Sequence, residues 1–84
     1  MIPNIQFEEI HSRYFVANYS PGGLVEPIFI ELTGFAGTQD WSVEFDGELV
    51  AEVIDGGLTC AVIACYQLLG ASTQQIFEII HLPL

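Results

Sequence analysis

An Asp46-Gly47 pair stands between two apolar segments, and it constrains the fold more than any other feature of the sequence. Asp-Gly is a preferred dipeptide for the two-residue turn that joins antiparallel strands. Before the pair, apolar residues alternate with polar ones, as in a strand with one buried face: Trp41, Val43 and Phe45. Residues 41–54 are therefore predicted to form a β-hairpin.

Two registers are open for this hairpin. A two-residue loop gives the pairs Phe45 with Glu48 and Val43 with Val50. A three-residue loop gives the pairs Phe45 with Leu49, Val43 with Ala51 and Trp41 with Val53. The longer loop separates apolar from acidic residues better, and we prefer it slightly because burial of one face enforces register. In both registers Glu44 and Glu52 point away from the core.

The segment after the hairpin is almost wholly apolar and is predicted to be a helix over residues 58–69. Its apolar stripe has helical spacing and consists of Leu58, Ala61, Val62, Cys65, Leu68 and Leu69. Asp55 is expected to cap the first turn by accepting backbone N–H groups, and Gly70 to end the helix. We expect this helix to pack against the sheet.

The first part of the chain predicts two more strands. Residues 5–19 are rich in β-formers and predict one strand, with an irregularity near Glu8-Glu9. The Ser-Pro-Gly-Gly sequence of residues 20–23 predicts a turn. Residues 24–32 predict a second strand, which pairs with the first as a hairpin and has Pro27 at an edge or near its start.

The end of the chain leaves two predictions open. Ser72 and Gln75 have the spacing of a capping box and favour a short helix over residues 73–81. A final strand is the alternative, because residues 76–81 are rich in β-branched and aromatic side chains. With 84 residues the chain has area for one core only, so residues 1–84 are expected to form a single domain. We predict an α+β fold, in which an antiparallel meander of three or four strands packs against one apolar helix plus a short C-terminal helix.

The charge of the chain limits its partners. The sequence has 1 Lys or Arg residue, Arg13, and 11 Asp or Glu residues, which gives a net charge of −10. Such a field repels nucleic acid and anionic membranes and attracts basic protein surfaces in a salt-dependent way. We therefore predict no direct binding of nucleic acid or membrane. Carboxylates with no cation among them gather along the hairpin and just after it: Glu44, Asp46, Glu48, Glu52 and Asp55.

Catalytic and metal-binding patterns are not found. His11 is the histidine expected on the sheet, and no nucleophile motif accompanies it. Cys60 and Cys65 are five positions apart on one helix, where they point in different directions and do not bridge. No pair of His or Cys residues has the local spacing of metal ligands. We predict a protein that is not an enzyme and has no cofactor or metal.

The remaining function class is recognition of another protein. The five hairpin carboxylates are predicted to bind a basic surface, namely the nucleic-acid site of a nuclease complex or of another nucleic-acid-binding protein. This is the strategy of the DNA-mimic and anti-CRISPR inhibitors that phages make. The alternative is a non-catalytic assembly module that acts through homodimerisation or an apolar interface, since 51% of the residues are hydrophobic. Residues 1–4 have no signal-peptide character, so we expect a cytoplasmic protein.

Overall fold

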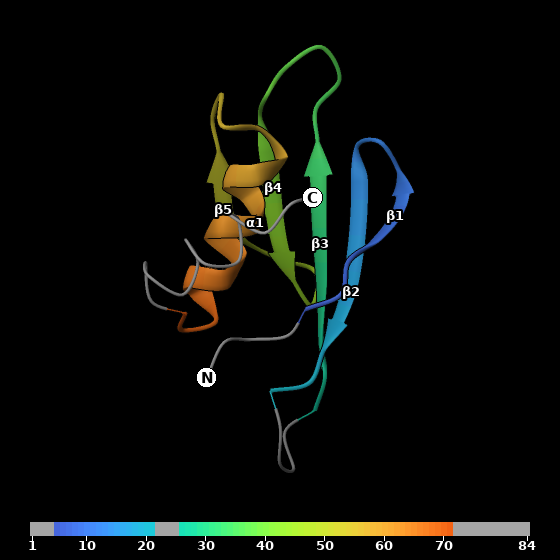
Figure 1. Ribbon diagram of the computed structural model, residues 1–84, viewed down its shortest axis with the longest axis vertical. Coiled ribbons are helices and arrows are strands. Elements are labelled where there is room, and N and C mark those ends of the chain that lie inside the picture. Colours follow the sequence, from blue (N-terminus) through green and yellow to red (C-terminus); the bar gives the residue numbers. More distant parts are fainter. Residues whose placement is uncertain (1–4, 22–25, 72–84) are drawn as a thin grey trace.

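The computed structural model describes residues 5–21 and 26–71 (Figure 1). Five strands form one antiparallel sheet in which each strand pairs with the next along the chain. They are β1 (Glu8–His11), β2 (Tyr14–Tyr19), β3 (Ile28–Gly34), β4 (Trp41–Phe45) and β5 (Glu48–Val53). The helix α1 (Gly57–Leu68) follows β5 and packs on one face of the sheet (Figure 1). The predicted α+β class, a meander against one apolar helix, is confirmed.

The first segment folds into two strands instead of the one that was predicted. The chain turns back at Ser12 and Arg13, so that His11 on β1 lies opposite Tyr14 on β2. The Arg13 N–H donates to His11 Nδ1 at 3.1 Å, which holds the turn without a proline or glycine. The register is irregular between Glu9 and His11, slightly later than predicted. The sheet consequently has five strands, where three or four were predicted.

The predicted hairpin between the first two strands is confirmed as β2 and β3, with Ala17 opposite Ile30. β3 begins at Ile28, directly after Pro27, because proline has no N–H to donate to a neighbouring strand. Part of the turn predicted at residues 20–23 lies outside the described residues. With β2 on one side and β4 on the other, β3 is the central strand of the sheet.

The turn between β4 and β5 has two residues. Phe45 pairs with Glu48, and Asp46 and Gly47 both have positive φ values, 51° and 81°, as a type I′ turn requires. The Asp46 carboxylate accepts the Phe29 N–H at 3.0 Å. The preferred three-residue loop is therefore wrong.

The register changes one step further along this hairpin. Val43 pairs with Ala51 and Trp41 with Val53, which are the pairs of the three-residue alternative. A β-bulge at Val50 reconciles the two registers, because one extra residue on β5 shifts the pairing. Trp41, Val43, Ala51 and Val53 thus share the face that packs on α1, although the turn is short.

The core lies between the sheet and α1. The largest fully buried side chains come from both layers: Ile30, Leu32, Val43 and Cys65. Ala61 and Cys65 are small, lie one turn apart and are fully buried, so α1 approaches the sheet closely. The predicted stripe is right for these two residues and for Leu58, Val62 and Leu69, which are partly buried against the core. It is wrong for Leu68, which is 48% exposed, and it omits Tyr66, which is buried.

The start of α1 differs from the prediction. The N-cap is Gly56, with no side-chain capping bond, so Asp55 does not cap the helix. Asp55 instead has φ 59°, and its N–H donates to Asp40 Oδ1 at 2.8 Å. A Cβ added at Gly56 would lie 2.7 Å from Cys60 Cβ and from Val53 Cγ1. Glycine is therefore required here by the close approach of β5 to α1.

The end of α1 agrees with the prediction. Gly70 has φ 92°, and its N–H donates to Gln67 O at 3.0 Å. The Ala71 N–H donates to Tyr66 O, also at 3.0 Å. These two bonds form a Schellman motif, which satisfies carbonyls at the helix end. The second helix predicted over residues 73–81 lies outside the described residues.

Candidate protein-binding face

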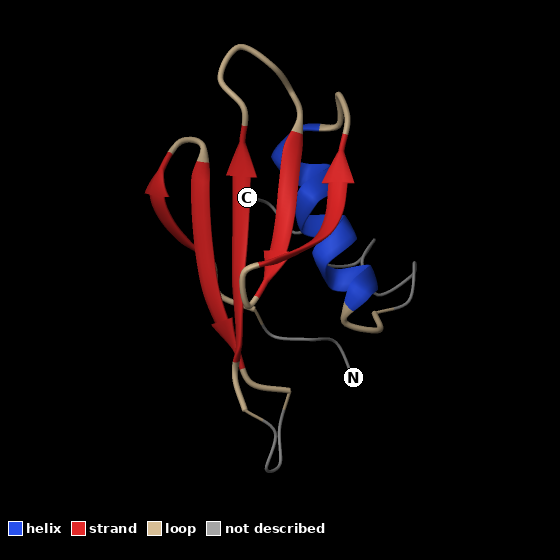
Figure 2. Ribbon diagram, turned by 180° about the vertical axis from the view of Figure 1, so that it is seen from behind, coloured by secondary structure: helices blue, strands red, loops and turns tan. Residues whose placement is uncertain are grey.

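The sheet face turned away from α1, here called the outer face, is largely polar and acidic. Because side chains alternate along a strand, residues next to core positions point to this face. In Figure 2 the outer face is toward the viewer, and no helix or strand of the described residues covers it. It carries Tyr14, Val16, Glu31, Thr33, Ser42, Glu44 and Glu52 on the four strands β2 to β5.

Three carboxylates lie in one row across the outer face. Glu31 on β3 and Glu44 on β4 are directly opposite each other. On the other side of Glu31 the pairing continues through Val16 to Glu8 on the edge strand β1, and beyond Glu44 it reaches Leu49. Since neighbouring strands are about 4.8 Å apart, Glu31 lies about one strand spacing from Glu44 and two from Glu8. We call Glu8, Glu31 and Glu44 the acidic row.

Tyr14 contacts the acidic row through its hydroxyl. The O–H donates to Glu31 Oε2 at 2.5 Å. This hydrogen bond raises the pKa of Tyr14, and desolvation and the charges of Glu31 and Glu44 raise it further. The tyrosine therefore stays neutral at physiological pH and leaves the negative charge of the row in place.

The side chain of Arg13, the single Lys or Arg of the chain, makes its hydrogen bond with the loop of residues 35–40. Its guanidinium donates to Thr38 O at 2.8 Å, and its carbonyl accepts the Gly34 N–H, also at 2.8 Å. These bonds tie the turn between β1 and β2 to the loop of residues 35–40. The guanidinium bond goes to a backbone carbonyl, so the side chain of Arg13 serves the fold at this place.

The outer face is hollowed along β4 and β5, next to the loop of residues 35–40. This hollow, which we call the β4–β5 depression, has a volume of about 390 Å³ and is lined by Phe35, Asp40, Trp41, Ser42, Glu44, Leu49, Glu52, Val53 and Ile54. Its apolar side chains are unusually accessible: Phe35 is 52%, Leu49 51% and Ile54 73% exposed. Exposed apolar surface beside polar groups is typical of a recognition site.

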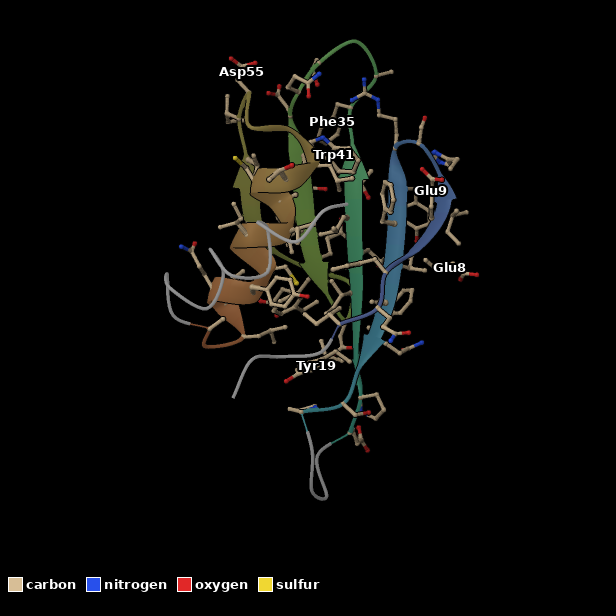
Figure 3. All side chains as sticks on the ribbon, viewed as in Figure 1. Glu8, Glu9, Tyr19, Phe35, Trp41 and Asp55 are labelled. Atoms are coloured by element: carbon tan, nitrogen blue, oxygen red, sulfur yellow. The ribbon has the colours of Figure 1, made fainter. Side chains whose placement is uncertain are left out.

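The five carboxylates that were predicted to bind a partner do not share one surface. Glu44 and Glu52 lie on the outer face and line the β4–β5 depression. Glu48 lies on the α1 side of the sheet, because the residue opposite it packs against the core. Asp46 sits in the hairpin turn, whereas Asp55 follows the other end of β5, where Phe35 and Trp41 also lie (Figure 3).

The structure brings in Glu31 and Glu8, which the sequence did not indicate as site residues. Glu31 stands between Ile30 and Leu32, both fully buried, so alternation alone places it on the outer face. Its position beside Glu44 depends on the pairing of β3 with β4. The alternation of side chains indicates that Glu31 points to the outer face. The residue that lies opposite it on the next strand cannot be predicted from this alternation.

Other chemistry has less support in the described residues. No three His, Cys, Asp or Glu side chains gather as metal ligands within residues 5–21 and 26–71. Cys60 and Cys65 are both free, the first exposed and the second buried. Burial raises the pKa of the Cys65 thiol to about 12, so it is protonated and a poor nucleophile at neutral pH. No helix in this part of the chain is long and apolar enough to cross a membrane.

The features that indicate a function therefore lie on the outer face. It has an acidic row, an adjoining depression that combines carboxylates with exposed apolar side chains, and no Lys or Arg other than Arg13 anywhere in the chain. Comparison of the chain with protein-family models, with curated proteins and with solved structures finds no match.

Proposed function

We propose that this protein is a small acidic inhibitor that occupies a basic nucleic-acid-binding surface of another protein, in the manner of phage anti-CRISPR and DNA-mimic proteins. The observation that supports it best is the opposed pair of Glu31 and Glu44 on the outer face. Like charges directly opposite each other destabilise a sheet. Solubility does not require two carboxylates directly opposite each other. A site that binds cations does require carboxylates that lie close together.

The charge density of the outer face suits a basic groove. Such a groove places Lys and Arg against the closely spaced phosphates of a nucleic-acid strand. Strands about 4.8 Å apart give the carboxylates of Glu31 and Glu44 a comparably close spacing. The net charge of −10 adds long-range attraction, which speeds association at low salt.

Affinity capture from a host extract tests this proposal. The immobilised protein is compared with a Glu31→Gln, Glu44→Gln double variant, which keeps the shape of the row and removes two charges. We expect a nucleic-acid-binding protein on the wild-type resin, much less of it on the variant, and its release by competing nucleic acid. Retention of the same proteins by both resins, or capture with no nucleic-acid-binding protein, would contradict the proposal.

The salt dependence of the purified complex then measures the electrostatic part. We expect the affinity to fall steadily as salt is raised, because screening weakens attraction between exposed charges. The slope should be smaller for the Glu31→Gln, Glu44→Gln variant. A flat salt dependence in the wild type would show that the acidic row is not what the partner recognises.

A second candidate function is a non-catalytic assembly module that acts as a homodimer. The exposed side chains of Phe35, Leu49 and Ile54 favour it. In a symmetric dimer through this surface, however, the carboxylates of the two copies would approach each other, so association should strengthen with salt. Sedimentation at low and high salt tests this candidate: a dimer that forms at high salt supports the assembly module, and a monomer at both salt concentrations counts against it.

A further inference from the structure

We infer that the β4–β5 depression is a socket for an arginine side chain of the protein partner, presented between aliphatic neighbours. This inference rests on the proposed function and deepens it, because it states which side chain of a basic surface is recognised and where. The juxtaposition that supports it is the hydroxyl of a largely buried serine beside two carboxylates, bordered by exposed apolar side chains.

Ser42 supplies a hydroxyl group to the depression. It is 7% exposed and is the only buried polar or charged residue in the part of the chain that the structure describes. Its hydroxyl forms no hydrogen bond with another described residue, yet the oxygen is not sealed from solvent. Because Ser42 lines the β4–β5 depression, its oxygen is an acceptor that is open to a ligand there.

Two carboxylates lie beside this hydroxyl. Glu52 is directly opposite Ser42 across the strands, where side chains start about 5 Å apart. Glu44 lies two residues along β4 on the same face, about 7 Å away along the strand. Asp40 adds a third carboxylate to the lining, and its Oδ1 accepts the Asp55 N–H at 2.8 Å. The depression therefore attracts a cation and repels phosphate.

The geometry favours arginine over lysine. A guanidinium group has five N–H donors in a planar fork and can donate to Glu44, Glu52 and Ser42 together. An ammonium group is a compact and strongly hydrated point charge, so it loses more hydration than a guanidinium group does when it enters a hollow with apolar walls. Three acceptor groups around one small space therefore match the planar guanidinium better than they match an ammonium group.

The apolar side chains around the depression favour an arginine that has aliphatic neighbours in the partner. The exposed side chains of Leu49 and Ile54 can cover an aliphatic stem and its neighbouring residues, as long cationic side chains bury their methylene groups on apolar surface. Phe35 offers a ring on the loop side of the depression, and guanidinium groups stack on aromatic faces. The occupant is thus an arginine with aliphatic neighbours, rather than a run of lysines.

The experiment uses a capped Leu-Arg-Leu peptide as the probe and the full chain labelled for methyl NMR. Matched peptides carry lysine or the uncharged isostere citrulline in place of arginine. We expect saturable shifts of the Leu49 and Ile54 methyl signals with the arginine peptide, binding weaker by roughly threefold or more with lysine, and loss of binding with citrulline. Equal affinity for arginine and lysine would overturn the socket, as would shifts that do not saturate.

Variants locate the site. Ser42→Ala and Glu52→Gln should each weaken binding of the arginine peptide. Glu9→Gln is the matched control, because Glu9 lies on the edge strand β1, outside both the acidic row and the depression. The amide spectrum of each variant confirms that it is folded. Equal weakening by Glu9→Gln would show general attraction to the negative charge of the protein and overturn the socket.

The outcomes separate this inference from the proposed function. Failure of the arginine peptide, together with salt-sensitive capture of a nucleic-acid-binding protein, overturns the socket and supports the inhibitor. Saturable binding of arginine in the β4–β5 depression, with no nucleic-acid-binding protein captured, supports the socket and overturns the inhibitor.

Discussion

Phe29 on β3 and Asp46 in the turn between β4 and β5 exchange two hydrogen bonds. The Asp46 N–H donates to Phe29 O at 2.8 Å, and the Phe29 N–H donates to Asp46 Oδ1 at 3.0 Å. The second bond involves the side chain, so this carboxylate holds the hairpin turn to the central strand. The carboxylate therefore has a structural role, and the partner-binding role that the sequence indicated for it stays a prediction.

Asp46→Ala should therefore lower the free energy of unfolding by about 1–2 kcal/mol, because alanine lacks the acceptor and is less suited to the left-handed backbone at this position. Asp46→Asn should lose less, since the amide oxygen can accept the same N–H and asparagine tolerates a positive φ. Urea denaturation measures both variants. An alanine variant as stable as the wild type would refute the structural role of the side chain.

Glu44→Gln should raise the free energy of unfolding by about 0.2–1 kcal/mol at low salt, because it removes one of two like charges that lie opposite each other. The gain should shrink as salt is added. Glu48→Gln is the control, since Glu48 lies on the α1 side of the sheet. Urea, which is uncharged, is the suitable denaturant. A loss of stability in Glu44→Gln would mean that its carboxylate makes a favourable contact.

The two thiols should react at very different rates. Cys60 is exposed and Cys65 is buried, so a thiol reagent should modify Cys60 quickly in the folded protein and Cys65 only after unfolding. Thiol titration with and without urea counts both groups, and mass spectrometry identifies the modified residue. Cys60→Ser should remove the fast phase. Equal rates for both thiols in the folded wild type would contradict the burial of Cys65.

The protein should lose stability at alkaline pH. Burial raises the pKa of Cys65 from 9.0 to about 12, so the unfolded chain releases this proton at a lower pH than the folded protein does. The stabilisation is complete below about pH 9 and is lost as the pH rises toward about 12. The pKa of Tyr66 is also raised, mainly by desolvation, and acts in the same direction.

Urea denaturation of wild type and Cys65→Ala under reducing conditions, at neutral and at alkaline pH, measures this effect. The alanine variant starts from a lower stability because it leaves a cavity, but its stability should fall less steeply with pH. Parallel pH dependences for the two proteins would show that Cys65 does not contribute to the alkaline loss.

The features that depend on neighbouring residues were predictable. β4 spans Trp41–Phe45, where apolar and polar residues alternate. The turn lies at Asp46 and Gly47, because this dipeptide accepts the positive φ values of a type I′ turn. Gly70 ends α1 for the same kind of reason, since glycine adopts the conformation that follows a helix. In each case the signal and the structure lie within a few residues of each other.

The turn at Ser12 and Arg13, which separates β1 from β2, was not predictable from neighbouring residues. This turn contains no Gly, Pro, Asn or Asp, and the Arg13 carbonyl accepts the N–H of Gly34, which is distant in the sequence. The bulge at Val50 has a similar origin, because it reconciles a short turn with burial of Ala51 and Val53 toward the core. Both features depend on contacts that form only when the sheet and α1 come together.

The candidate site also combines features that the sequence determines with features that depend on the tertiary structure. The sequence by itself determined that the chain is strongly acidic and that alternation sends Glu31, Glu44 and Glu52 to the face opposite the core. Only the tertiary structure decided that Glu31 and Glu44 are neighbours and that Ser42 lies beside two carboxylates. The reason is that alternation is a local property of a strand, whereas the side chains that meet across a sheet depend on register, which burial against the helix and the turns between distant strands determine.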